Sequence, residues 1–389
     1  MRRVQAIATV ALFFVFAALP LAIQFASPPA SGAWENRMLA PAPVWPMHWR
    51  DIAPFTRATT AWIDDHFGLR RAFVELNNTV RFTVFGESAN PQLAFGAGRR
   101  LFFISHEAVA PTQLVDFLCA GGGNPAGMRT LAGGLAGFMD DAAKRAARTL
   151  YVLVPTKTIV QADLLPQWLQ ARCVGGVPAV PAILAALHAS RPDVADRVVY
   201  PLDRMRALGA DAYPAPNFHW EGDAPRLIAT DVAQRFGRML IAPLPMQRER
   251  HVADLQNMLP GVRLRFVADE PDFAAAGIAA CDCISALGTA GPVLSDVSRF
   301  VRPGARAPRL LLLSDSFGKA IAPWFAAYYA EVWHISLSHV GRLSAAQVVA
   351  LRRTLFDTYQ PDDVLFVFHD FSAAYINDLL RRSFWEIGP

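Results

Sequence analysis

Short apolar segments alternate with segments of helical periodicity through the last two thirds of this chain. Helices are predicted at 128–147, 179–190, 223–237, 319–330 and 344–358, and strands at 149–154, 197–201, 263–267, 309–313, 332–336 and 363–368. Strands that alternate with helices of this length pair through right-handed crossovers, which build a parallel sheet covered on both faces. The sequence therefore predicts an α/β fold, namely a three-layer α/β/α sandwich with a mostly parallel sheet.

The first part of the chain lacks this alternation. Residues 34–127 are predicted to form an irregular N-terminal segment with extra elements, among them a helix within 58–85 and a short strand at 98–105. His66 lies on that helix, whose apolar residues recur at helical spacing, so we expect it to be structural. The α/β core is predicted at 128–389.

Residues 1–33 are predicted to be a membrane anchor or a signal segment. Arg2 and Arg3 precede residues 6–26, which carry no charge. A stretch of this length can span a bilayer, and the two arginines would keep the amino terminus in the cytoplasm. Small residues at 31–33 also fit a signal-peptide cleavage site. The remaining chain is expected in the periplasm, either anchored to the inner membrane or released.

Composition excludes some partners. The chain has 389 residues and is 53% apolar, so it can bury one large core or two modest ones. The net charge is +4, and the arginines are scattered without a basic run interleaved with aromatic residues. Nucleic acid is therefore not expected as a partner. A slightly basic surface would suit an anionic polysaccharide or a membrane surface, although ordinary solvated charges explain this balance better.

The segment 309–318 places one serine at the end of a predicted buried strand. Four consecutive leucines stop at a small-residue turn with Ser316 at its tip. The carboxyl ends of strands in open α/β sheets are where such proteins place their chemistry. A serine nucleophile needs a base within hydrogen-bond reach, and the best candidate is His219. The alternatives are structural: Ser316 as a helix cap, and His219 as a half-buried partner of Trp220.

Several short motifs, taken in order, resemble one protein family. Residues 314–317 (Ser-Asp-Ser-Phe) resemble its Gly-Asp-Ser-Phe serine motif, and residues 217–220 (Asn-Phe-His-Trp) resemble its Asp-x-His-Trp motif. Three weaker similarities lie at 34–41 (Trp-Glu-Asn-Arg-Met-Leu-Ala-Pro), at 65–70 (Asp-His-Phe-Gly-Leu-Arg) and at 154–157 (Val-Pro-Thr-Lys) with Leu165 and Pro166. The family is that of the AlgJ- and AlgX-like periplasmic SGNH-type O-acetyltransferases, which act in the biosynthesis of alginate and related exopolysaccharides.

The resemblance implies a single SGNH-hydrolase-like acyltransferase domain at 34–389. Such a protein would transfer acetyl groups to hydroxyls of an exported polysaccharide through an acyl-serine intermediate. It would receive them from a membrane-bound O-acyltransferase. Neither a cofactor nor a metal is expected.

The expected site residues follow from the two main motifs. Ser316 would attack the acyl donor, and His219 would take its proton and later activate the sugar hydroxyl. Asn217 stands where the family has an acid, and it would orient His219 through its side-chain oxygen. Replacement of such an acid by its amide costs about 10⁴ in turnover in a serine protease. If Asn217 does not act, Asp211 or Asp223 could fill the role.

Four further residues are expected to line the substrate site: Asp315, Trp220, Lys157 and His369. Lys157 also has a structural or electrostatic interpretation. His369 with Asp370 has a rival role, because in ordinary SGNH hydrolases the catalytic histidine follows the serine. Backbone N–H groups at the start of helix 319–330 are expected to hold the oxyanion.

The four cysteines form an even set in a presumed oxidising compartment. One disulfide is expected, and Cys119 with Cys173 is the preferred pair. Cys281 and Cys283 are separated by one residue, which is too tight for a usual bridge. They also lack a second Cys or His pair that zinc would need.

Three functions remain open at this stage. The first is the polysaccharide O-acetyltransferase, and the second is an acyl esterase of the same fold, which would pass the acyl group to water. The third is an inactive polysaccharide-binding or scaffold protein, which the amide at position 217 favours.

Overall fold

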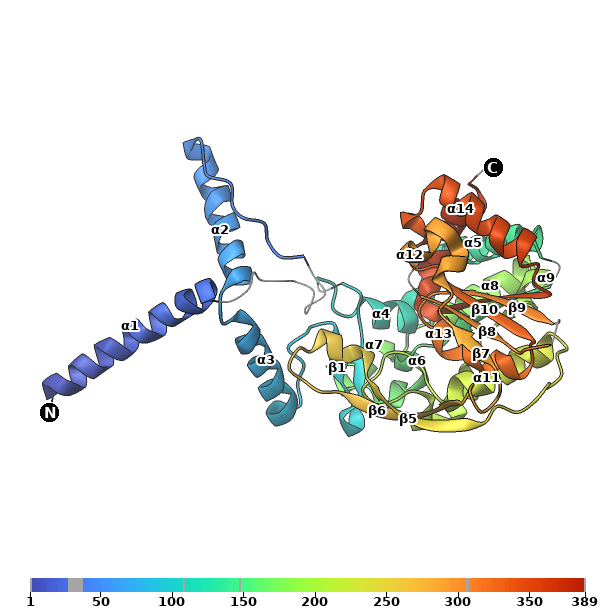
Figure 1. Cartoon of the computed structure of the whole chain (residues 1–389), viewed down its shortest axis with the longest axis horizontal. Coiled ribbons are helices and arrows are strands. Elements are labelled where there is room, and N and C mark those ends of the chain that lie inside the picture. Colours follow the sequence, from blue (N-terminus) through green and yellow to red (C-terminus); the bar gives the residue numbers. More distant parts are fainter. Residues whose placement is uncertain are drawn as a thin grey trace. The chain divides into compact units, whose positions relative to one another are not determined.

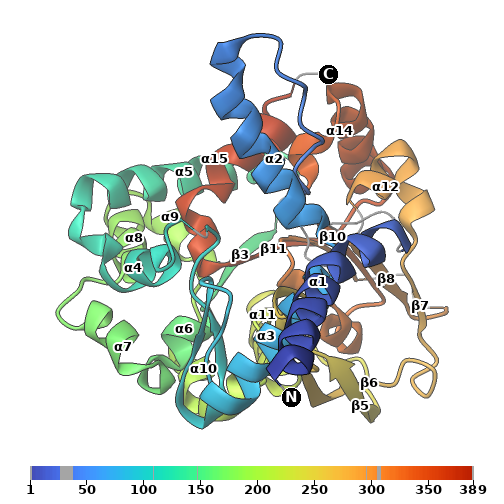
Figure 2. The ribbon, with the colours of Figure 1, turned by 90° about the vertical axis from the view of Figure 1, so that its left-hand side faces the viewer.

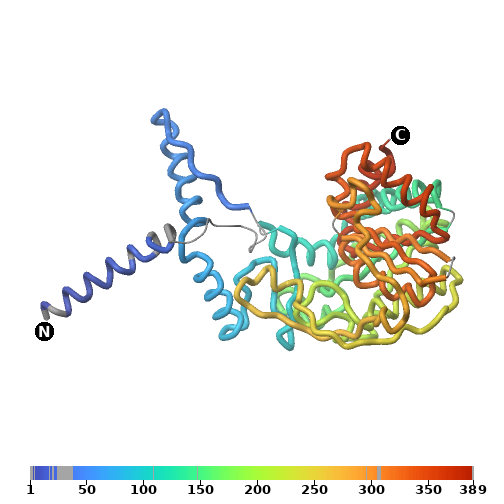
Figure 3. The backbone as a smooth tube through the Cα atoms, viewed as in Figure 1, coloured from blue at the N-terminus to red at the C-terminus, as the bar shows by residue number. Residues whose placement is uncertain are grey.

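The computed structural model describes residues 2–26, 38–107, 109–146, 148–294, 296–304 and 308–387 (Figure 1, Figure 3). The chain divides into two compact units, Met1–Pro91 with Leu255–Leu264, and Gln92–Asp254 with Arg265–Pro389. The second unit thus begins earlier than the α/β core predicted from residue 128. The predicted cleavage residues at 31–33, and 34–37 of the family-like segment, lie outside the described residues.

The first unit is built from helices. Its α-helices are α1 (Arg2–Ala26), α2 (Ile52–His66) and α3 (Arg70–Val80), and a π-helical turn follows α3 at Arg81–Phe85. His66 stacks on Trp62 with ring centroids 4.8 Å apart, and its Nδ1 lies 2.9 Å from the Trp62 carbonyl oxygen. These contacts are intrahelical. Within the described part of the chain, no helix combines the length and apolar character that a membrane crossing requires.

The second unit contains a seven-stranded sheet in the order β4-β3-β11-β9-β10-β8-β7. Its strands are β3 (Thr149–Val154), β4 (Val198–Val199), β7 (Ala279–Cys281), β8 (Val297–Val301), β9 (Arg309–Ser314), β10 (Glu331–Ser336) and β11 (Asp363–His369). The five strands from β4 to β10 pair in parallel, while β8 is antiparallel to β10 and β7 is antiparallel to β8. The predicted α/β fold with a mostly parallel sheet is therefore confirmed.

Helices cover both faces of this sheet. Leu311 and Leu313 pack in one core with residues of α5 (Pro125–Ala143) and α8 (Ala179–Ser190). Leu310 and Leu312 pack in a second core with residues of α11 (Asp223–Arg235). Figure 2 shows α5 and α15 (Ile376–Leu380) on one side of the sheet and α11 on the other. Alternate leucines of β9 thus enter opposite cores, which explains why this strand is apolar at every position from Leu310 to Leu313.

The remaining α-helices of the second unit are α4 (Gln113–Ala120), α6 (Lys157–Val160), α7 (Gln167–Cys173), α9 (Pro192–Ala195), α10 (Leu202–Ala207), α12 (Gly291–Leu294), α13 (Gly318–Ile321) and α14 (Ala345–Arg352). Two small antiparallel pairs lie outside the main sheet, β1 (Leu93–Phe95) with β2 (Leu101–Phe103) and β5 (Met246–Val252) with β6 (Arg265–Pro271).

Three details differ from the sequence-based elements. The helix predicted at 319–330 is only α13 followed by a 3₁₀ segment at Ala322–Ala327, which carries a proline near its start. Proline lacks the N–H that would continue the α-helical bonding. The strand predicted at 263–267 belongs to the β5–β6 hairpin and not to the main sheet. β7 and β8 are absent from the sequence-based elements.

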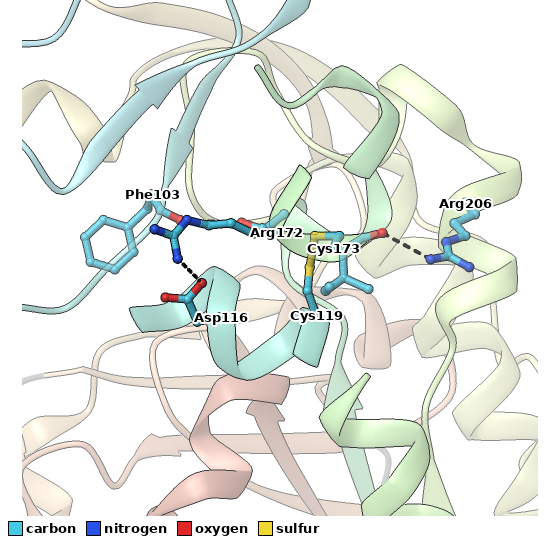
Figure 4. The surroundings of a disulfide bond; sticks show 8 residues. Phe103, Asp116, Cys119, Arg172, Cys173 and Arg206 are labelled. Atoms are coloured by element: carbon cyan, nitrogen blue, oxygen red, sulfur yellow. Dashed lines mark hydrogen bonds and ion pairs between the residues drawn. A yellow bond between two sulfur atoms is a disulfide. The ribbon is translucent and has the colours of Figure 1, made fainter. Parts of the chain in front are cut away.

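Two disulfides are present. Cys119 at the end of α4 bonds to Cys173 at the end of α7, as predicted, and Figure 4 shows this bond beside the ion pair of Asp116 with Arg172. Cys281 also bonds to Cys283, so the expectation that this pair is too close is wrong.

Loss of the Cys119–Cys173 bond should destabilise the fold strongly. The bond closes a loop with a sequence separation of 54, and the chain-entropy argument assigns such a loop about 4 kcal/mol. Replacement of both cysteines by serine should lower the free energy of unfolding in urea by about this amount. The matched control replaces Cys281 and Cys283, whose loop has a separation of only 2 and is worth about 1 kcal/mol. Equal losses in the two double variants would contradict this interpretation.

Candidate active site

Ser316 and His219 meet at the carboxyl end of the sheet. Ser316 lies two residues after the end of β9 and is exposed, and His219 lies in the loop that leads into α11. The His219 Nε2 atom lies 2.8 Å from the Ser316 Oγ atom. A base at this distance can accept the hydroxyl proton, which is the arrangement that an activated serine requires. The structure thus brings together the two main residues singled out from the sequence.

Asp254 orients the imidazole. Its Oδ2 atom lies 2.5 Å from His219 Nδ1, on the side of the ring opposite to Ser316. The backbone N–H groups of Phe218 and His219 also donate to this carboxylate, at 2.8 and 3.0 Å. Burial raises the pKa of Asp254, but the hydrogen bonds and charge of His219, with these backbone donors, outweigh it and leave the pKa below its usual value. The carboxylate therefore stays ionised and holds the proton on Nδ1, which leaves Nε2 free to accept one from Ser316.

Asn217 does not orient the imidazole, so that prediction is wrong. Its Oδ1 atom accepts the backbone N–H of Asp254 at 2.8 Å, and its Nδ2 atom donates to the His219 carbonyl oxygen at 3.1 Å. Only an amide offers both a donor and an acceptor here, because an ionised carboxylate cannot donate. Asn217 thus joins the two segments that carry His219 and Asp254. No described hydrogen bond joins Asp211 or Asp223 to His219.

Sequence reasoning missed Asp254 because the residue is separated from His219 by 35 positions and carries no motif. It stands two residues after β5, whose side chains are almost all exposed. If residues 246–271 had been predicted to form a hairpin, Asp254 would have stood just after the end of its first strand. That position is the one signal in the sequence that points to Asp254.

Trp220 fastens the histidine loop to the serine turn. Its side chain is fully buried, and its Nε1 donates to the Phe317 carbonyl oxygen at 2.9 Å. The adjacent rings of Phe218 and Phe317 pack against the His219 imidazole, with centroids 5.0 and 4.7 Å away. The expectation that Trp220 binds substrate is therefore wrong, since none of its surface is accessible.

Asp315 and His369 form a buried pair beside the serine turn. The Asp315 Oδ2 atom lies 2.6 Å from His369 Nδ1, and Oδ1 accepts the Phe317 N–H at 2.9 Å. Burial raises the pKa of Asp315, but the charge and hydrogen bonds of His369 outweigh it and lower the pKa overall. The His369 ring stacks on Phe317 at 5.1 Å, and no described hydrogen bond joins it to Ser316. Both residues are buried, so they shape the serine turn instead of binding substrate. The rival role of His369 as the base would need a contact with the Ser316 hydroxyl, which the described hydrogen bonds do not include.

Lys157 is a structural residue. Its buried Nζ atom donates to three carbonyl oxygens of the histidine loop, those of Pro214 at 2.8 Å, Ala215 at 2.7 Å and Asn217 at 3.1 Å. Burial, followed by the charge of Arg100, lowers the pKa of Lys157 well below its usual value. The expectation that Lys157 contacts substrate is wrong, because all its donors are used inside the protein.

Gly318 permits the close packing of the serine turn. The Ser314 Oγ atom lies 2.8 Å from His334 Nε2, and a Cβ built on Gly318 would lie 2.0 Å from that same Oγ. Any larger residue at 318 would displace Ser314. The hydroxyl of Ser314 is thus accommodated by a hydrogen bond to a buried histidine.

The backbone N–H groups just before the helix start differ in whether they are free to hold an oxyanion. The Phe317 and Gly318 N–H groups are already bonded to Asp315, at 2.9 and 3.2 Å. The Ser316 N–H has no hydrogen-bond partner among the described residues. It is therefore the available donor for an oxyanion that forms on a carbonyl attacked by Ser316.

A cavity of about 580 Å³ opens beside Ser316 and His219. Its walls include aromatic side chains and several carboxyl groups, among them Glu221 and Glu270. Burial, followed by the negative charges of Glu270 and Asp254, raises the pKa of Glu221 to about 8. At the hairpin, Glu249, His251 and Glu270 each place one potential ligand atom within 4.8 Å of the others, which is the spacing of a possible cation site.

Asp370, next to His369, should make stability depend on pH. Burial raises its pKa from 3.8 to about 6, although it accepts the Thr156 N–H at 3.1 Å and the Tyr200 hydroxyl at 3.2 Å. The stability that its protonated form contributes is present below the unfolded pKa and is lost as pH rises through about 6.

Wild type should therefore lose up to about 3 kcal/mol relative to Asp370→Asn between pH 4 and pH 7, measured by urea unfolding. Asp203→Asn, which removes an exposed carboxylate of α10, is the control and should follow wild type. If the stability of Asp370→Asn changes with pH as that of wild type does, the raised pKa of Asp370 would be contradicted.

The sequence matches no model of a known protein family and no curated protein. Several solved structures are similar at low identity. A DHHW family protein from Eubacterium siraeum is 14% identical, with 67% of this chain and 89% of that chain covered and a TM-score of 0.46. PatB1 from Bacillus cereus is 15% identical, with coverages of 64% and 91% and a TM-score of 0.42.

The O-acetyltransferase domain of Pseudomonas putida AlgJ is 16% identical, with coverages of 74% and 95% and a TM-score of 0.41. At such identities and scores, these similarities do not assign an activity. Any functional conclusion therefore depends on the geometry around Ser316.

Proposed function

We propose that this protein is an acyl-transfer enzyme whose nucleophile is Ser316. The observation that carries the proposal is the continuous chain of hydrogen bonds from Ser316 through His219 to Asp254. Nucleophile, base and orienting acid are recognised by this geometry and not by their order in the sequence. The exposed Ser316 hydroxyl at an open cavity adds the access that a substrate needs.

The first half of the reaction forms an acyl-enzyme. The Ser316 oxygen bonds to the carbonyl carbon of the acyl donor while its proton moves to His219 Nε2. Asp254 stabilises the resulting imidazolium, and the Ser316 N–H donates to the oxyanion. The imidazolium then protonates the leaving group as its bond to the carbonyl carbon breaks.

The second half transfers the acyl group. A hydroxyl of the acceptor loses its proton to His219 Nε2 and bonds to the acyl carbon. The bond to Ser316 breaks, and the imidazolium returns the proton to Ser316 Oγ. The same residues thus serve both halves.

The acyl group in this proposal is acetyl, and the acceptor is a hydroxyl of an exported polysaccharide. The support is the ordered set of short segments that resemble motifs of exopolysaccharide O-acetyltransferases, two of which, at 217–220 and 314–317, form the site described above. A membrane-bound O-acyltransferase would supply the acetyl group.

Esterase activity is the second candidate. Ser316 is exposed, and the side chains of His219 and Asp254 keep 24% and 28% of their surface accessible. Water can therefore reach an acyl-serine, and hydrolysis competes with transfer. The inactive-scaffold interpretation depended on the amide at position 217. It loses this support, because the carboxylate of Asp254 contacts the imidazole.

The test incubates the full chain with an activated acetyl ester, with and without a glycan acceptor. A transferase should release the leaving group faster when the acceptor is present and should yield an acetylated glycan. Release that is unaffected by every acceptor would indicate an esterase. No release above that of the Ser316→Ala variant would overturn the proposal.

Export is part of the proposal and rests on Arg2, Arg3 and the uncharged residues 6–26. A reporter that is active only in the cytoplasm should be silent when fused after Pro389. An active reporter would contradict export.

A further inference from the structure

The cavity beside Ser316 is rich in negative charge. Five carboxyl groups line it: Glu221, Asp254, Asp269, Glu270 and Asp296. Lys319 is the one lysine or arginine among the described lining residues, and the two histidines there are His219 and His251. Asp254 contacts His219 Nδ1, and the His251 Nε2 atom lies 3.0 Å from Glu270 Oε1. Glu221 is largely neutral at pH 7, because its pKa is raised to about 8. The negative charge therefore comes from Asp254, Asp269, Glu270 and Asp296, and Lys319 balances only one of these four. The cavity is therefore acidic, although the chain as a whole has a net charge of +4.

The β5–β6 hairpin contributes to this imbalance. Its register places His251 opposite Phe266 and Gln247 opposite Glu270. Because side chains alternate along a strand, His251, Phe266 and Glu270 share one face, and all three line the cavity. The alternate positions hold three arginines that are not among the described lining residues: Arg248, Arg250 and Arg265. Asp269 also occupies an alternate position, opposite Arg248, although it lines the cavity.

The raised pKa of Glu221 reflects the same negative potential. Apart from burial, the causes that raise its pKa are the charges of Glu270 and Asp254, and Lys319 only partly opposes them. A further anion in this cavity would meet the same repulsion. A cation would be attracted, because unlike charges within a few ångströms interact strongly where water is partly excluded.

Aromatic side chains complete the walls: Phe266, Phe273, Phe300 and Trp324. The rings of Phe273 and Phe300 lie 4.7 Å apart. Aromatic faces pack against the apolar C–H face of a sugar ring, attract cations, and leave the hydroxyls to the carboxyl groups. This combination suits a sugar that is not negatively charged.

We propose that the acceptor glycan carries amino groups and no carboxylates, so that this cavity selects against uronate polymers such as alginate. The inference rests on the proposed acyl transfer at Ser316 and specifies its acceptor. A uronate ring would place its carboxylate near Glu270 and Asp296, whereas an ammonium group would neutralise part of their charge.

The test measures binding without turnover. The full chain with Ser316→Ala is titrated by calorimetry with glucosamine, N-acetylglucosamine and mannuronate oligomers of equal length. The glucosamine oligomer should bind at least about tenfold more tightly than the mannuronate oligomer, and added salt should reduce this ratio. The neutral oligomer should lie between them.

Two variants assign the effect to the cavity. Glu270→Gln should lower the ratio of glucosamine to mannuronate affinity, because it removes one negative charge from the lining. Asp203→Asn removes the same charge from α10, outside this cavity, and should leave the ratio unchanged. Equal effects of the two variants would show that net charge, and not the cavity, sets the preference.

Each titration is run in EDTA and again with Ca²⁺ or Zn²⁺, since a cation held by Glu249, His251 and Glu270 could reverse the charge preference. Mannuronate binding as tight as glucosamine binding in any of these conditions would overturn the proposal. Because Ser316→Ala removes the nucleophile, this result is independent of the acetyl-ester assay. A failed acetyl-ester assay would refute acyl transfer, while a failed titration would refute only the acceptor class.

Discussion

Replacement of Asp254 by asparagine should lower acetyl-ester turnover about 10⁴-fold, which corresponds to about 5.5 kcal/mol of transition-state stabilisation. The Asp254 carboxylate accepts both the backbone N–H and the Nδ1–H of His219 through Oδ2. An asparagine that turns its NH₂ group toward Nδ1 would require an unprotonated Nδ1, and the proton would then sit on Nε2. His219 could no longer accept the proton of Ser316. Steady-state kinetics with an activated acetyl ester measure the loss.

Asn217→Asp is the matched comparison, because the family-like motif alone would predict a gain. We expect no gain, since Asn217 contacts the Asp254 N–H and the His219 carbonyl oxygen and not the ring. A carboxylate there loses the donor and faces a carbonyl oxygen, which should cost about 1–3 kcal/mol of stability. The charge-conserving swap Asn217→Asp with Asp254→Asn should be as slow as Asp254→Asn alone. A swap variant that recovers turnover would identify position 217 as the orienting site.

The central sheet was predictable wherever strands are buried on both faces. β3 at 149–154 and β9 at 309–314 are built around the continuous apolar runs 150–154 and 310–313, so the local sequence specifies both strands almost to the residue. α8 at 179–190 coincides with its predicted bounds. Burial on both faces of a parallel sheet removes the need for polar positions, and this makes the signal strong.

The hairpin of β5 and β6 had no comparable signal. Six of the seven β5 residues are exposed, and the strand consists largely of charged and polar side chains. Its stability comes from pairing with β6, which begins 13 residues after β5 ends. A strand of this kind is defined by its partner and not by its own periodicity. Asp254 follows it, so the missed hairpin and the missed acid have the same cause.

The contact between Ser316 and His219 was predictable because short motifs place these residues at strand and helix ends. The roles of the neighbouring residues were not, because spacing says nothing about side-chain direction. Lys157 and Trp220 point into the protein. Lys157 donates to carbonyl oxygens of the histidine loop, and Trp220 donates to the Phe317 carbonyl oxygen of the serine turn. Their sequence positions beside the motifs reflect the need to hold those loops in place.

Ser316→Ala should abolish turnover, with a loss of about 10⁴- to 10⁶-fold, because the variant has no oxygen that can form the acyl-enzyme. Intact-protein mass spectrometry after a brief exposure to the acetyl ester should show one added acetyl group on wild type and none on the variant. Peptide mapping should place that group on residue 316. Folding is checked by thermal unfolding, which should change little since the Ser316 side chain is exposed.

Ser372→Ala is the control that tests the buried alternative. The Ser372 hydroxyl lies 2.8 Å from His369 Nδ1 and donates to Asp315 at 3.0 Å, so these three residues also combine a serine, a histidine and an acid. Ser372 is fully buried, and the His369 ring packs against the rings of Phe218 and Phe317. An ester therefore cannot reach the Ser372 hydroxyl. The Ser372→Ala protein should still acquire the acetyl group at Ser316. Loss of labelling in a folded Ser372→Ala protein, together with labelling retained in Ser316→Ala, would move the nucleophile to the buried cluster.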